Sequence, residues 1–384
     1  MSSPPRPFRS SLLVAVVAGV EIRVHASFVL ILAFGAIQWG ATYGARGALF
    51  GALLMLCLFF CVVLHELGHS LVAKAFGLPV REIILLPIGG VSRMEKNPEK
   101  PIHELVISIV GPIVNLVIAA VLFAVAGTGL SPAEQGALLK GTALPPSSRA
   151  ALVWLIGANV LLALFNMIPA FPMDGGRVLR AVLALAIGPR RATAAATALG
   201  QLIAIALGLL GVFTGNVLLA LVALFIFLGA GQEHMEERAR VVLGTLRVGD
   251  AYNKYAITLA PGDLVSRVVD YLLTSYQPDF AVVQGGRLLG VVTRDSILKQ
   301  LAGGTEDAYV AGMMDREPVR VQASQTLDEV RHELMEKGAR LAAVFEGERF
   351  LGLVSLEDIA EALLVVSFQK GQQQRRAAMD ARPD

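Results

Sequence analysis

A short polar cluster, His65-Glu66-Leu67-Gly68-His69, interrupts a long apolar run of this chain. On a helix, residues four apart lie on one face, so the two imidazoles can reach one metal ion. Glu66 lies beside them and can act as a general base on a metal-bound water. Two imidazole nitrogens, a carboxylate and an open fourth position form a ligand set that suits zinc.

The position of this cluster strengthens the metal hypothesis. An HExxH pattern by itself also occurs by chance on the surface helices of soluble proteins. Here the pattern follows the 18 uncharged residues 47–64 and continues a predicted membrane helix. Ionisable residues at membrane depth are energetically costly and normally mark function. The location therefore favours a metal site over a solvated helix face.

A second polar cluster occupies residues 166–177, where the sequence reads Asn-Met-Ile-Pro-Ala-Phe-Pro-Met-Asp-Gly-Gly-Arg. Irregular backbone at membrane depth is tolerated only where it lines protein or a water-filled cavity. Asp174 is therefore well placed to supply a third metal ligand. It can also act as the N-cap of the next helix, and both roles are compatible because one oxygen can cap while the other binds.

Other candidate ligands are weaker. His103 and the Glu-Leu that follows it begin like the first cluster, but Ile107 occupies the place of the second imidazole. We expect the start of an interfacial helix there. Cys57 and Cys61 share the i+4 stripe of His65, so a redox or inhibitory metal role is conceivable. Packing as small apolar side chains is the commoner role of buried thiols.

The elements that carry these clusters differ in composition from the rest of the chain. Only 17% of the 384 residues are charged, against about 25% in soluble domains. The deficit lies in residues 26–232, whereas residues 233–384 resemble a soluble protein. The net charge is +2 and no long basic run occurs, which argues against a nucleic-acid partner.

The apolar runs are long enough to cross a bilayer, which requires about 20 residues per helix. We expect a multi-span α-helical membrane protein of about six helices, at residues 26–45, 47–64, 105–133 and 150–173, with two more within 192–232. Loop charges follow the positive-inside rule if both termini and the soluble half are cytoplasmic. Residues 12–25 suggest a short β-hairpin at the membrane surface. This pattern suits a multi-pass protein of a prokaryotic cell membrane.

The soluble half contains a repeat. Residues 285–297 recur as residues 347–359, an offset of 62, with six of thirteen positions identical. Each copy has the pattern helix, strand, turn, strand, helix, with turns at 285–286 and 346–347. Two copies of such a period indicate a paired α+β module rather than a solenoid.

The membrane half resembles the site-2 protease family of intramembrane zinc metalloproteases. The resemblance rests on the two clusters above, together with Pro-Ile-Gly-Gly-Val at 87–91 and Gly-Pro-Ile-Val-Asn at 111–115. It implies His65, His69 and Asp174 as ligands of one zinc ion and Glu66 as the catalytic base. It also places Asn166 near the metal, where its amide can hydrogen-bond the oxyanion.

The same resemblance implies the substrate and how it is held. Such enzymes hydrolyse a peptide bond in or near the transmembrane segment of a membrane-anchored regulatory protein. Gly89, Gly90 and Asn115 match regions that hold the substrate in extended form. Pairing as an added β-strand exposes a scissile bond that a helical substrate hides within its own hydrogen bonds.

The soluble half resembles a tandem pair of CBS domains, which commonly bind ATP or another adenosine nucleotide. In the second copy, Ser355 and Asp358 match the hydroxyl and the carboxylate that hold the ribose. The first copy has Thr293, but Ser296 takes the place of the acid and Asp295 is displaced by one residue. Nucleotide binding is therefore more credible in the second copy. The alternative is a structural pair, or one that joins two chains in a homodimer.

These features predict five segments and leave two rival functions. The segments are a transmembrane metalloprotease domain (1–235), a linker (236–246), CBS domains at 247–303 and 308–366, and a disordered tail (367–384). A CBS-regulated transporter or channel would spread polar residues along a path across several helices, whereas here they concentrate in two clusters. A non-catalytic metal or nucleotide sensor would bind its ligand and cleave nothing.

Overall fold

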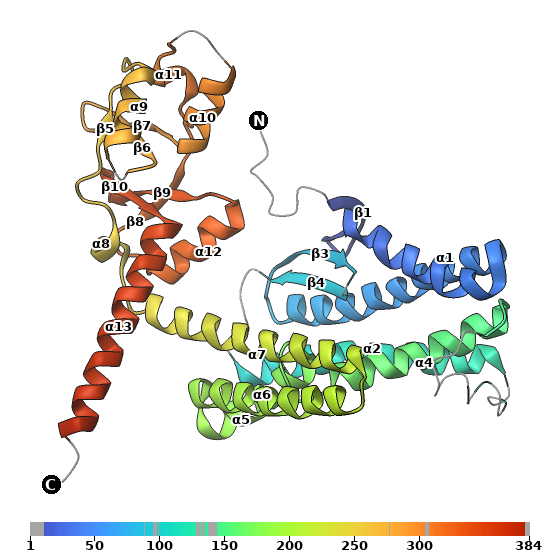
Figure 1. Ribbon diagram of the computed structural model, residues 1–384. Coiled ribbons are helices and arrows are strands. Elements are labelled where there is room, and N and C mark those ends of the chain that lie inside the picture. The colour runs from blue at the N-terminus through green and yellow to red at the C-terminus, as the bar shows by residue number, and fades with distance from the viewer. Residues whose placement is uncertain are drawn as a thin grey trace. The chain divides into compact units, whose positions relative to one another are not determined.

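The computed structural model describes residues 11–87, 89–94, 98, 100–127, 131, 134, 136, 144–275, 277–303 and 307–380. The chain forms two compact units, one of Phe8–Glu237 and one that contains Arg238–Asp384 (Figure 1). The boundary lies in the predicted linker at 236–246. Most of that linker is helical, because helix α7 (Val217–Leu243) continues through it.

The first unit begins with a helix that turns back on itself. Helix α1 spans Val29–Ala75, and Gly44 inside it has φ 64°, outside the helical range. The two halves lie side by side (Figure 1), and a Cβ on Gly35 would lie 2.5 Å from the carbonyl oxygen of Gly51. Glycines at this contact let the two backbones approach closely. The first two predicted spans are therefore the two halves of α1.

Five further described helices contribute apolar spans or carry the site. They are α2 (Pro101–Ala126), α4 (Ser148–Asn166), α5 (Asp174–Ile187), α6 (Pro189–Phe213) and α7. Among the described residues, five helices are long and apolar enough to cross a membrane, with α1 counted once. The predicted span 150–173 ends earlier, at Asn166, because the proline-containing segment 167–173 is irregular. Helix α5 is the helix expected after the second polar cluster, but its N-cap is Met173 and Asp174 is its first residue.

A four-stranded sheet accompanies the helices. Its strands are β1 (Ser11–Val17), β2 (Val20–His25), β3 (Val80–Leu86) and β4 (Gly89–Met94), in that spatial order. The predicted hairpin at 12–25 is confirmed as the antiparallel pair β1–β2, with Ala18 and Gly19 at positive φ in the turn. Strand β3 pairs parallel with β2 and antiparallel with β4. Strand β4 therefore forms one edge of the sheet.

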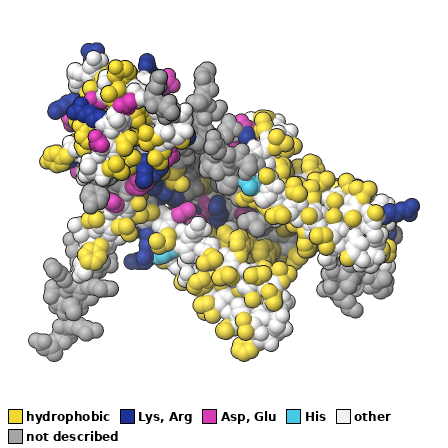
Figure 2. All heavy atoms as spheres, turned by 45° about the horizontal axis from the view of Figure 1, so that its top comes forward, with side chains coloured by type: hydrophobic (Ala, Val, Ile, Leu, Met, Phe, Trp, Pro, Cys, Tyr) yellow, Lys and Arg dark blue, Asp and Glu magenta, His cyan; other side chains and the backbone are white. Residues whose placement is uncertain are grey.

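The surface of the helical unit is apolar. Large apolar side chains point outward along its helices, including Leu202 at 63% exposure and Phe213 at 84%. Figure 2 shows apolar side chains covering much of these helices, whereas charged side chains are frequent on the second unit. Soluble proteins rarely expose apolar patches of this extent. The outward-facing side chains therefore fit a lipid environment.

The second unit contains two three-stranded sheets, and each belongs to one copy of the repeat. The first sheet has the order β5-β6-β7 (Thr258–Leu259, Phe280–Gln284, Arg287–Val292). The second has the order β10-β9-β8 (Arg349–Ser355, Leu341–Glu346, Val319–Gln322). The two sheets share a buried apolar cluster that includes Val291 and Phe345. The predicted α+β pair is thus confirmed.

Helices complete both copies, and the ends of the second copy differ from the prediction. The helices are α8 (Val248–Ala251), α9 (Val265–Thr274), α10 (Arg294–Gly303), α11 (Val310–Met313), α12 (Leu327–Lys337) and α13 (Leu356–Asp380). The second hairpin turn lies at 347–348, one residue later than expected. The tail predicted to be disordered from 367 is helical as far as Asp380, since its Gln, Arg and Ala residues favour helix. Residues 381–384 lie outside the described residues.

Candidate metal centre

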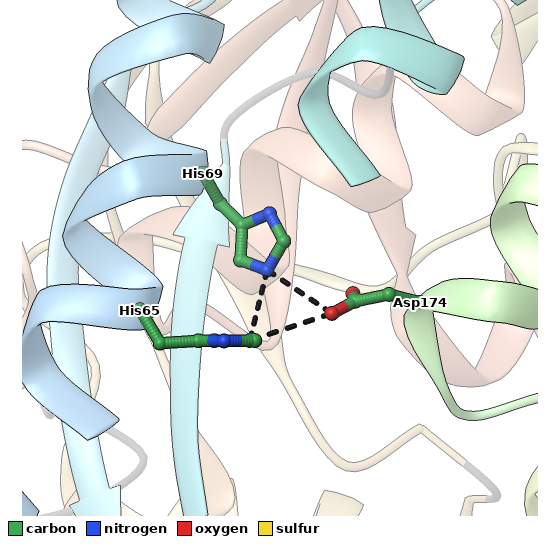
Figure 3. A group of neighbouring side chains, drawn as sticks. All are labelled: His65, His69 and Asp174. Carbon is green, nitrogen blue, oxygen red and sulfur yellow. Dashed lines mark hydrogen bonds and ion pairs between the residues drawn. The ribbon is translucent and has the colours of Figure 1, made fainter. Parts of the chain in front are cut away.

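Three predicted ligands from two distant segments meet in the helical unit. His65 and His69 project from the second half of α1, and Asp174 is the first residue of α5. The Nε2 atoms of the two imidazoles are 3.1 Å apart. They lie 3.4 Å and 3.2 Å from Oδ2 of Asp174. Figure 3 shows these three side chains pointing toward one common point.

Local backbone geometry explains how Asp174 reaches this point. Segment 167–173 folds closely over the first turn of α5. A Cβ on Gly176 would lie 2.6 Å from the backbone nitrogen of Phe171, and one on Gly175 would collide with the carbonyl oxygens of Met167 and Ile168. Only glycine allows this approach. The two glycines after the acid therefore let α5 begin beside the second half of α1.

The orientation of His69 is set by a neighbouring helix. Its Nδ1–H donates a hydrogen bond of 2.7 Å to the backbone oxygen of Ile107 on α2. Because a carbonyl only accepts, the proton is on Nδ1, and the lone pair of Nε2 faces His65 and Asp174. A partner on the second ring nitrogen is a usual feature of metal-binding histidines. The Nδ1 atom of His65 is buried without a hydrogen bond among the described residues.

The residues present fit a zinc ion. One potential ligand atom from each of the three side chains lies within 4.8 Å of the others, and both imidazoles are buried. Two nitrogens and one carboxylate leave a fourth position open, as in catalytic zinc sites. Gly111 of α2 closes one side, since a Cβ there would lie 2.6 Å from Cε1 of His65 and closer still to the ring of His69.

Glu66 lies between the metal centre and the sheet. A Cβ on Gly90 would be 2.5 Å from Cγ of Glu66 and 3.3 Å from its Oε1. Gly90 belongs to β4, so the edge strand of the sheet passes directly beside this carboxylate. Gly89 has φ 136°, a conformation that favours glycine. Gly89 and Gly90, which were predicted to contact the substrate, thus lie in the strand beside Glu66, the predicted catalytic base.

The two predicted asparagines occupy different surroundings. Asn115 is fully buried on α2, one turn after Gly111, and its Oδ1 has no hydrogen bond among the described residues. Asn166 is half-buried at the last position of α4. The described contacts include no hydrogen bond between Asn166 and the three convergent side chains.

Sequence reasoning did not single out Gly111 or the ion pair between Arg180 and Glu104. Gly111 was quoted only as part of a motif, and Arg180 lies just outside the second polar cluster. A signal existed for the ion pair, because a Glu at the start of one apolar span and an Arg within a helix after the second polar cluster both need partners near the membrane.

In the second unit, the predicted nucleotide-binding residues act as helix caps. Ser355 Oγ donates to Asp358 Oδ2 at 2.8 Å, and the Asp358 N–H donates to Ser355 Oγ at 3.0 Å. In the first copy, the Thr293 N–H donates to Ser296 Oγ at 3.1 Å, and the Ser296 N–H donates to Thr293 Oγ1 at 3.3 Å. Reciprocal bonds of this kind stabilise a helix start. The signature residues therefore have a structural role without any ligand.

One arginine connects the two helix starts. Arg340 Nη2 lies 2.8 Å from Glu357 Oε1, and its Nη1 lies 3.9 Å from Asp295 Oδ1. Asp295 and Glu357 occupy equivalent positions in the two copies. Buried Asp279 lies nearby and accepts a hydrogen bond from the Arg294 N–H at 2.9 Å. Burial raises the pKa of Asp279 above its usual value.

Comparison with known proteins gives matches over both units. The model of "Peptidase family M50" matches residues 53–143 and 135–210. The model of "CBS domain" matches residues 248–303 and 310–365, close to the predicted boundaries.

Relatives match along nearly the whole chain. Zinc metalloprotease MJ0392 of Methanocaldococcus jannaschii is 32% identical over 92% of this chain and 96% of its own length. Putative zinc metalloprotease sll0528 of Synechocystis is 28% identical over 90% of this chain and 93% of its own length. The solved site-2 protease from Methanocaldococcus jannaschii is 36% identical, with a TM-score of 0.41, over 58% of this chain and 95% of that one.

Proposed function

Because the chain belongs to peptidase family M50, the site-2 protease family, and carries tandem CBS domains, we propose that it is an intramembrane endopeptidase that cuts a membrane-anchored regulatory protein. The chain is a zinc metalloprotease of the membrane, of the site-2 type. The convergence of His65, His69 and Asp174 beside Glu66 and the edge strand is the observation that carries the proposal.

Each residue of the candidate site has a separate role. His65, His69 and Asp174 hold one zinc ion. When bound, zinc lowers the pKa of a water ligand and polarises the substrate carbonyl. Glu66 takes a proton from the attacking water and delivers it to the leaving amine. Asn166 hydrogen-bonds the developing oxyanion.

The substrate pairs with the free edge of β4. An edge strand offers unpaired N–H and C=O groups to another strand. Gly89 and Gly90 leave room for a backbone to approach, and Glu66 lies against Gly90. Buried Asn115, whose Oδ1 has no hydrogen bond among the described residues, holds the extended substrate from α2. A strand placed there presents its peptide bonds to the metal centre.

The remaining elements set the topology and the regulation. Both termini and the CBS domains lie in the cytoplasm of a prokaryotic cell. The CBS pair binds an adenosine nucleotide through Ser355 and Asp358, and in the first copy through Thr293. It tunes the access or activity of the protease and joins two chains as a homodimer. The reciprocal caps supply the hydroxyl and carboxylate positions that such binding uses.

Cleavage by the Glu66→Gln variant tests the proposal. Full-length protein is produced in cells as wild type, as Glu66→Gln and as Glu361→Gln, an exposed position of α13 that serves as a control. New chain termini within membrane spans are then mapped by mass spectrometry. We expect the termini to appear with the wild type and the control, and to fall by about 10²–10⁴-fold with Glu66→Gln. If Glu66→Gln yields the new termini as abundantly as the wild type does, the protease mechanism is wrong and the transporter or sensor function is favoured.

A further inference from the structure

A buried ion pair joins the two helices that flank the metal centre. Arg180 of α5 donates from Nε to Glu104 Oε1 of α2 at 2.8 Å, and its Nη2 donates to the same oxygen. The side chains of Arg180 and Glu104 are 14% and 8% exposed. Charge-assisted contacts by two nitrogens of one guanidinium restrict the geometry of both partners.

Each partner of this pair is close to one component of the metal centre. Glu104 lies three residues before Ile107, about one helical turn away, and the Ile107 carbonyl orients His69. Arg180 lies less than two turns after Asp174 on α5. The pair therefore connects the helix that orients one ligand with the helix that supplies another. We propose that Arg180 is a positioning residue for the metal centre and that its contact with Glu104 holds Asp174 in reach of His69. This inference rests on the proposed function.

The surroundings explain how the charges are accommodated. A pocket of about 80 Å³ borders the pair, and its other lining residues include Ile107, Ser108 and Arg177. Its lining is mainly polar, so water can hydrate the charges and reduce the cost of their burial. Glu104 and Ile107 both line this pocket, so the ion pair and the His69 partner border one polar pocket.

A weaker third member comes from α7. Nη1 of Arg180 lies 3.9 Å from Oε1 of Glu233, whose side chain is 27% exposed. A distant, partly exposed pair of this kind contributes little. Glu104 is therefore the dominant partner of Arg180. Replacing Glu104 by Gln should have a larger effect than replacing Glu233 by Gln.

Zinc affinity of the full chain in detergent tests the inference. Metal-free protein is titrated with Zn²⁺ against a chromophoric chelator. We expect Arg180→Gln and Glu104→Gln each to weaken zinc binding by about 10–100-fold, the usual range for outer-shell residues that orient a ligand. Glu233→Gln should change the affinity by less than about fivefold. Arg190→Gln, an exposed arginine at the start of α6, is the matched control and should bind zinc like the wild type.

Thermal unfolding of the same samples separates positioning from general stability. A purely structural pair would lower the unfolding temperature and leave the zinc affinity of the folded protein unchanged, which would overturn the inference. If Arg180→Gln does not fold, the double variant Glu104→Arg/Arg180→Glu, in which the two charges exchange places, tests the inference instead. Zinc affinity near wild type supports positioning, and weak binding by a folded exchanged pair refutes it. Wild-type protein that binds no zinc would refute the proposed function itself.

Discussion

The two units of this molecule use charged side chains in opposite ways. In the helical unit, three of the four buried acidic, basic or histidine side chains described, His65, His69 and Glu104, lie in or beside the candidate metal centre, and the fourth, Arg23, pairs with Glu21 in the sheet. In the CBS unit, many charges form exposed pairs, such as Lys337 with Glu333 at 2.6 Å, where the lysine is 52% exposed. Exposed pairs of this kind contribute little to stability.

This difference determines how much a sequence motif in each unit indicates about function. A charge in an apolar helix is costly, so its presence calls for a compensating function. The HExxH cluster was therefore informative before any fold was known. In the CBS unit, the Ser355 and Asp358 signature is also a helix cap. The same residues would be expected in a pair that binds nothing, so the motif alone carries less information there.

The largest predicted effect comes from the tight packing at the metal centre. In Gly111→Ala, the new Cβ would collide with both imidazoles. We expect zinc affinity to fall by more than about 100-fold. Titration with Zn²⁺ against a chelator measures this fall.

Gly208→Ala is the matched control for this substitution. Its Cβ would meet only the Cβ of Ala223, at 3.6 Å, an ordinary contact in the same unit. A Gly111→Ala protein that binds zinc like this control would show that α2 does not close the metal centre.

Two exposed leucines test whether the helical unit faces lipid and the CBS unit faces water. Leu202 of α6 is 63% exposed and Leu273 of α9 is 77% exposed. Lysine at the centre of a membrane helix costs about 3 kcal/mol, whereas a surface substitution in a soluble domain usually changes stability by less than about 0.5 kcal/mol. We expect Leu202→Lys to reduce the amount of inserted protein and Leu273→Lys to leave it unchanged.

Membrane fractionation followed by quantification of full-length protein measures both variants. Similar yields of the two lysine variants would contradict the assignment of α6 to lipid. A third variant, Leu202→Ala, distinguishes the introduced charge from the loss of the leucine side chain.

The smallest predicted effect concerns the caps of the CBS unit. Asp358→Ala removes an acceptor from the start of α13 and should destabilise this unit by about 1 kcal/mol. If Asp358 also holds a ribose, AMP should protect α13 from hydrogen exchange in the wild type and fail to do so in the variant. Equal protection by AMP in both proteins would leave Asp358 with its capping role alone.

The sequence predicted most of this fold because the strongest signals were local. Apolar runs indicated the helices, the repeat indicated the paired module, and the polar clusters contained all three convergent side chains. Helix α5 was not counted among the apolar spans because its 14 residues begin with a charge and carry two arginines.

The remaining features depend on contacts between distant segments. The parallel pairing of β2 with β3 joins strands separated by the whole of α1, and local periodicity holds no information about such a partner. The same applies to Arg180 and Glu104, which lie 76 residues apart in sequence. The role of Gly111 was hidden for a different reason, since a missing side chain leaves no chemical signal in the sequence.

If a substrate pairs with β4 as proposed, the edge position of this strand influences which bonds are cut. Pairing between backbones ignores side-chain identity, so many sequences can bind as long as they unwind locally. Alternate residues of a strand point to opposite faces, and a slip of one residue turns every side chain over. Candidate cleavage points along one substrate should therefore be spaced two residues apart, which makes selectivity a matter of alignment rather than of a preferred amino acid.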